Sequence, residues 1–76
     1  MTKTIVGEQP FQSVNGNFSV SPSNEGYTLQ YSADGIHYSS YETPVAANDT
    51  LIVTGLPLLP IFWRLYGNNS TVTVQL

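Results

Sequence analysis

Residues 27–41 alternate apolar and polar side chains on both sides of the dipeptide Asp34-Gly35. Strict alternation is typical of a half-buried β-strand, and Asp-Gly favours a two-residue hairpin turn with positive φ at both positions. Such a turn sets the register of the two strands, because directly paired residues share a face of the sheet. The predicted opposite pairs are Ala33 with Ile36, Tyr31 with Tyr38, and Leu29 with Ser40. The predicted buried face then holds Tyr27, Leu29, Tyr31, Ile36 and Tyr38.

The rest of the chain also shows strand and turn patterns, and no window has a helical period. Further strands are predicted over residues 4–6, 11–14, 17–21, 50–54, 61–66 and 71–76. The dipeptide Asn15-Gly16 predicts a hairpin between residues 11–14 and 17–21. The turn residues 67–69 predict a second hairpin between the last two strands, which leaves residues 71–76 as a sheet edge or a pairing surface.

About seven short strands at spacings near ten residues are typical of a β-sandwich or a small barrel. The chain of 76 residues is short enough to form one domain, over residues 1–76. We therefore predict an all-β fold, a small antiparallel β-sandwich of the immunoglobulin-like kind. A small β-barrel or a jelly roll is the alternative.

The composition excludes several classes of function. Charged residues make up 9% of the chain, against about 25% in typical domains. Lys3 and Arg64 are the only cations, which argues against nucleic acid as a partner. Cysteine is absent, so no disulfide or thiolate metal site is expected. The apolar residues 56–65 are interrupted by two prolines and are shorter than the ~20 residues of a membrane helix. With no signal-peptide pattern, we expect a soluble protein made in the cytoplasm.

Residues able to support catalysis are few and scattered. His37 is the only histidine, and its place beside the turn predicts an exposed strand residue. A catalytic histidine needs a nucleophile and an orienting acid, for which Asp34 is near in sequence. The carboxylates lie in predicted loops or turns without the spacing of a calcium loop. We therefore expect no enzyme activity, no cofactor and no metal site.

The most apolar segment, residues 55–63, contains Pro57 and Pro60, which exclude a central strand there. Leu58 and Leu59 on this stiffened loop would form a pre-ordered apolar contact for a partner. The alternative is a loop that covers one end of the sandwich. Tyr41 falls on the face opposite the predicted core and is the aromatic residue best placed for an exposed contact.

Residues 61–66 alternate in a way that leaves apolar bulk on both faces. Trp63 and Leu65 share one face, whereas Phe62, Arg64 and Tyr66 share the other. This pattern suits a central strand or a strand covered by a neighbouring subunit.

One further pattern extends over residues 26–74. It consists of Tyr27-x-Leu29-x-Tyr31-Ser32-x-Asp34-Gly35, then Tyr38-x-x-Tyr41, then Leu51-x-Val53-x-Gly55-Leu56-Pro57, then Phe62-x-Arg64-Leu65-x-Gly67-Asn68. It resembles small structural proteins of tailed bacteriophages that are encoded near the major capsid protein, especially in the crAss-like group. These include auxiliary capsid (decoration) proteins and head-fibre proteins, which have no catalytic residues.

The resemblance implies a non-enzymatic virion structural protein, made in the host cytoplasm and placed on the capsid exterior. Its expected partners are the major capsid protein or other virion proteins, and further copies of itself as a homo-oligomer. The expected contacts are Leu58, Leu59 and Phe62, followed by Tyr41 and by Ile5 on the N-terminal strand, which could exchange between subunits. The alternative function is a carbohydrate-binding β-sandwich module, in which Tyr41 or Trp63 contacts a glycan.

Overall fold

A computed structural model describes residues 1–13, 16–42, 44–56 and 59–76. These residues form β-strands and loops, and they contain no helix, membrane-spanning or otherwise. The eight strands are β1 (Thr2–Val6), β2 (Phe11–Ser13), β3 (Phe18–Val20), β4 (Thr28–Ser32), β5 (Ser39–Ser40), β6 (Leu51–Val53), β7 (Ile61–Tyr66) and β8 (Thr71–Gln75). Each strand overlaps a segment in which the apolar-polar alternation predicted one, although residues 33 and 36–38, which were predicted to pair, lie in a loop.

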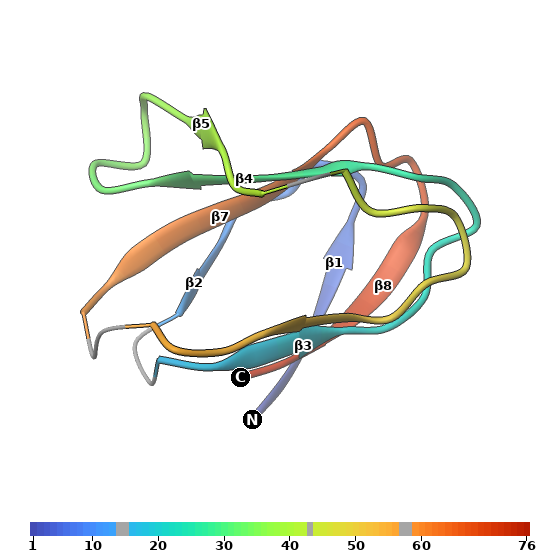
Figure 1. The fold of residues 1–76 in the computed structure, drawn as a ribbon, viewed down its shortest axis with the longest axis horizontal. Coiled ribbons are helices and arrows are strands. Elements are labelled where there is room, and N and C mark those ends of the chain that lie inside the picture. The colour runs from blue at the N-terminus through green and yellow to red at the C-terminus, as the bar shows by residue number, and fades with distance from the viewer. Residues whose placement is uncertain (14–15, 43, 57–58) are drawn as a thin grey trace.

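The strands form two antiparallel four-stranded sheets that face each other (Figure 1). Sheet A has the order β1-β8-β3-β6, and sheet B has the order β2-β7-β4-β5. The predicted all-β antiparallel sandwich is confirmed. Its strand pairs are nested, β1 with β8, β2 with β7, β3 with β6 and β4 with β5. Nested pairing over two sheets is the connectivity of the jelly roll, which was the alternative to an immunoglobulin-like order.

The core lies between the two sheets and takes one residue in two from each long strand. Its buried apolar members are Ile5, Phe11, Phe18, Val20, Tyr27, Leu29, Val53, Trp63, Leu65, Val72 and Val74. Trp63 is the largest of them. Its ring packs edge-to-face with that of Phe18, and the two ring centres are 4.9 Å apart. Its indole Nε1 donates a hydrogen bond of 2.8 Å to the buried Ser13 hydroxyl. The polar atom of the largest core side chain is therefore satisfied inside the sandwich.

Two predicted hairpins are wrong. Residues 11–13 belong to sheet B and residues 18–20 to sheet A, so the chain crosses between the sheets near Gly16. Of the Asn15-Gly16 dipeptide on which this prediction was based, Asn15 lies outside the described residues, as does Val14. The chain crosses again between β7 and β8. As a result β8 pairs with β1 on one side and β3 on the other, and it is neither an edge nor a free pairing surface.

The hairpin over residues 27–41 exists, but its predicted register is wrong. The observed opposite pairs are Gln30 with Ser40 and Tyr31 with Ser39. The loop therefore spans residues 33–38, and only Gly35 in it has positive φ, at 78°. The cause is a set of hydrogen bonds to the Asp34 carboxylate, described below, which a two-residue turn could not form.

The longer loop changes which side chains are buried. Tyr27 and Leu29 lie in the core as predicted, whereas Tyr31 is 41% and Ile36 is 75% exposed. Tyr38 is half-buried. Tyr41, predicted to lie on the opposite face, instead packs against the core, with its ring edge-on to Trp63 at 5.3 Å.

Candidate interaction surface

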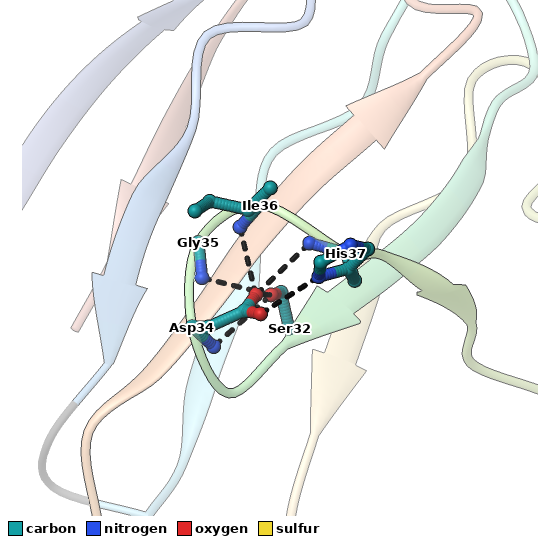
Figure 2. Close-up of polar contacts among 5 residues, drawn as sticks. All are labelled: Ser32, Asp34, Gly35, Ile36 and His37. Carbon is teal, nitrogen blue, oxygen red and sulfur yellow. Dashed lines mark hydrogen bonds and ion pairs between the residues drawn. The ribbon is translucent and has the colours of Figure 1, made fainter.

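The loop between β4 and β5 is built around the Asp34 carboxylate (Figure 2). Its Oδ1 accepts hydrogen bonds from the backbone N–H groups of Ile36 (2.8 Å) and His37 (2.9 Å), and from the Ser32 hydroxyl (2.7 Å). Its Oδ2 lies 2.9 Å from His37 Nδ1. The Ser32 hydroxyl oxygen accepts in turn from the N–H groups of Asp34 and Gly35. These bonds fix the shape of the loop.

The same bonds stabilise the ionised form of Asp34. The pKa of this carboxyl is held well below its usual range, first by the His37 side chain and then by the two backbone N–H groups and Ser32. The three side chains Ser32, Asp34 and His37 do not form a nucleophilic triad. The serine proton is directed at the aspartate rather than at the imidazole, and the serine is buried. The His37 side chain is exposed, as predicted, but it lies in the loop and not in a strand.

The loop lies over the outer face of sheet B, the face turned away from sheet A. Ser32 is opposite Phe62 in the register, and both point to this face. Gly35 approaches the Phe62 ring so closely that a Cβ there would be 3.5 Å from it. Phe62 is therefore half-buried beneath the protein's own loop.

Next to Phe62 on the same face, Arg64 lies against two tyrosine rings. Its guanidinium carbon is 4.4 Å from the centre of the Tyr38 ring and 5.4 Å from that of Tyr66. Its Nε donates a hydrogen bond of 2.6 Å to Gln30 Oε1, from the residue directly opposite on β4. We call Tyr38, Arg64 and Tyr66 the Tyr–Arg–Tyr stack. Its rings hold the guanidinium in place by cation–π contact.

The charge of Arg64 has no acidic partner in the described part of the chain. The ion pair found there joins His37 and Asp34, and no carboxylate lies within 4.0 Å of the guanidinium. Tyr66 is 52% exposed beside it. Tyrosine and arginine are among the residue types most enriched at the energetic centres of protein interfaces.

The carboxylates at the other end of the sandwich act as hydrogen-bond acceptors for loops. Glu8 accepts from the N–H of Gly67 (2.7 Å), and Glu25 accepts from that of Asn69 (3.0 Å). The buried Asn68 accepts from the Ser23 hydroxyl at 2.8 Å. Within the described ranges, no group of three or more His, Asp or Glu side chains is placed to hold a metal ion.

The structure places the predicted contact residues in different environments. Leu58 lies outside the described residues. Leu59 is 55% exposed, whereas Phe62 is half-buried on the outer face of sheet B. Tyr41 is half-buried against Trp63, and Ile5 is fully buried in the core. Of these predicted contacts, only Phe62 belongs to the face that carries the Tyr–Arg–Tyr stack.

Sequence reasoning missed the stack, although part of its signal was present. The alternation in residues 61–66 correctly placed Phe62, Arg64 and Tyr66 on one face. Tyr38 was assigned to the core because the predicted hairpin register was wrong. The observed loop is longer than the predicted two-residue turn, and it places the Tyr38 ring over Arg64.

Comparison with protein-family models, with curated proteins and with solved structures finds no match to this chain.

Proposed function

We propose that this protein is a non-enzymatic structural component of a bacteriophage virion, an auxiliary capsid or head-fibre protein. It is made in the host cytoplasm and attaches to the capsid exterior through the outer face of sheet B. The major capsid protein or another virion protein is the partner. The observation that carries the proposal is the Tyr–Arg–Tyr stack, because it combines interface-type side chains with a positive charge that lacks an acid.

Two further features support the proposal. The chain has few charged residues, and charge depletion is typical of the desolvated centre of an interface. The jelly-roll connectivity is common in viral capsid domains and in lectins, which is an analogy at the level of the fold. Of these two groups, the motif resemblance over residues 26–74 favours the viral structural proteins.

The test is co-sedimentation of the purified protein with capsids of the phage that encodes it. We expect saturable binding that Tyr66→Ala weakens at least about tenfold, because the stack loses one of its two rings. Tyr31→Ala is the matched control, since Tyr31 is similarly exposed but points to the other face of sheet B. Absence of capsid binding by the wild-type protein would overturn the proposal.

A second candidate function is glycan binding, which one observation favours. Exposed aromatic rings on a sheet face offer stacking surfaces for sugar rings, and Tyr66 is such a ring. Trp63 is 1% exposed, so the ring that contacts a glycan would be Tyr66 rather than Trp63. A glycan-array signal that Tyr66→Ala abolishes and Tyr31→Ala retains would favour this function over capsid attachment.

A further inference from the structure

The four edge strands of the sandwich differ in how they are protected against pairing with another chain. On β1, Lys3 lies opposite the buried Val74 and thus on the inward side of the strand. An inward-placed charge on an edge opposes the addition of another strand. Pro10 precedes β2, and β5 has only two residues. Proline and short length are two further ways in which proteins blunt an edge.

The fourth edge, β6, is short at three residues, but it has neither a charge nor a proline. Residues 50–54 read Thr-Leu-Ile-Val-Thr, without charge, proline or glycine. Among the described residues β6 pairs with β3 alone, and no backbone hydrogen bond is found on its other side. Ile52, at its centre, is 69% exposed and points outward. An apolar, β-branched edge strand of this kind is a template for strand addition.

A pocket of about 190 Å³ opens beside this edge, on the inward side of β6. It is lined by the inward-facing Leu51 and Val53 and by Leu29, Tyr41 and Val45 of the opposite layer, and Glu42 also lines it. An added strand would place its own inward-facing side chains over this opening. The free edge and the open pocket are thus two separate observations at one place.

We propose that β6 is a self-association edge, at which two copies of this chain pair antiparallel about a two-fold axis through Ile52. The symmetric pairs are Ile52 with Ile52, Leu51 with Val53, and Thr50 with Thr54. Sheet A of one copy then continues into sheet A of the other. The two Ile52 side chains form an apolar cross-strand pair, and the inward Leu51 and Val53 of each copy lie next to the other's pocket.

The charges of the chain are compatible with this pairing, although each copy has a net charge of −3. In the two-fold register Asp49 of one copy lies opposite Gly55 of the other, so no two acids of the strand segment face each other. The paired strands themselves are uncharged, and the acid of the adjoining pocket, Glu42, lies outside the paired segment. This contact uses sheet A and leaves the outer face of sheet B open, so it is independent of the capsid attachment proposed above.

Site-specific crosslinking tests the register directly, because the chain contains no cysteine. Directly opposite residues in an antiparallel pair have Cα atoms about 4.5–5.5 Å apart, within the range that a disulfide spans. We expect Ile52→Cys to oxidise to a disulfide-linked dimer at least about tenfold faster than Ile36→Cys. Ile36 is the matched control, with similar exposure on a loop. Equal rates for the two variants would overturn the register.

Sedimentation equilibrium tests the association itself. We expect wild-type protein to show a concentration-dependent monomer–dimer equilibrium, and Ile52→Lys to raise its dissociation constant at least about tenfold, since two like charges would face each other. Ile36→Lys should leave the equilibrium unchanged. A wild-type protein that stays monomeric at millimolar concentration would overturn the proposal, and this outcome would leave the capsid-binding result unaffected.

Discussion

Both faces of β7 carry aromatic side chains, but Trp63 on the inner face is buried, whereas the side chains on the outer face are partly or largely exposed. On the inner face, the Trp63 ring is buried, its N–H is bonded to Ser13, and its edges meet Phe18 and Tyr41. On the outer face, Arg64 is held between Tyr38 and Tyr66, but it has no acidic partner among the described residues. The contacts of Trp63 are therefore satisfied within one chain, whereas Arg64 is held in place without an acid to neutralise its charge among the described residues.

This difference separates contacts that stabilise the fold from side chains that are held in place at the surface. Inner-face contacts are made once the chain folds, so changes there alter the free energy of unfolding. Outer-face contacts pre-order Arg64 and two rings at a surface, so changes there should alter binding far more than stability. The predictions below test this separation, from the largest expected effect on stability to the smallest.

Trp63→Ala should reduce the free energy of unfolding by about 3–5 kcal/mol, because it removes the largest buried side chain and leaves a cavity. In a domain of this size that loss approaches the whole stability. Denaturant titration followed by circular dichroism measures it. Loss of less than about 1 kcal/mol would show that the two sheets do not depend on this ring.

Ser13→Ala tests the hydrogen bond that Trp63 Nε1 donates to Ser13, without removing the Trp63 ring. The substitution leaves the Trp63 N–H buried without its acceptor, which should cost about 1–3 kcal/mol although only one atom is removed. Ser39→Ala, at an exposed strand position, is the control and should change little. An equal effect of both substitutions would contradict the buried hydrogen bond.

Tyr27 marks the one polar atom of the inner face that the described residues leave without a partner. Burial raises the pKa of its phenol from 10.0 to about 12. The neutral form is therefore favoured in the folded state, and this contribution is present below pH 10 and lost as the pH rises through 12. Tyr27→Phe should leave stability at pH 7 unchanged or higher by about 1 kcal/mol, and should reduce alkaline unfolding. Thermal melts across this pH range provide the measurement.

The Asp34 loop gives the smallest predicted effect, because the loop is exposed. The pKa of the carboxyl is lowered in the folded state, so the charged form stabilises the loop above the ordinary pKa of 3.8. That contribution is lost as the pH falls below this value. Asp34→Asn should therefore flatten the acid limb of the stability profile, measured by urea denaturation between pH 6 and pH 2. Identical profiles would contradict the hydrogen-bond set around Asp34.

Much of the fold could be predicted from the sequence, because side-chain alternation is a local signal. It located each strand and placed Trp63 and Leu65 together on one face, which the structure shows to be the inner face. The connections could not be predicted as reliably. A turn such as that after β7 is compatible both with a hairpin and with a crossing to the other sheet, and only long-range packing decides between them.

Whether the candidate surface could be predicted depended on which of two turns forms at Asp34-Gly35. Asp-Gly favours a two-residue turn, yet the Asp34 carboxylate gains backbone N–H groups of Ile36 and His37 only in the longer loop. The resulting shift moved Tyr38 from the predicted core to the outer face, over Arg64. The alternation in residues 61–66 therefore placed Arg64 and Tyr66 on one face, but the sequence could not place Tyr38 beside them.

Arg64→Ala is the sharpest test of the proposal that the outer face of sheet B binds a partner. Both its free energy of unfolding and its affinity for the capsids should be measured on the same preparation. We expect stability to fall by at most about 1 kcal/mol, the usual size of an exposed cation–π contact, and capsid affinity to fall at least about tenfold. Unchanged affinity in a variant that folds normally would contradict the claim.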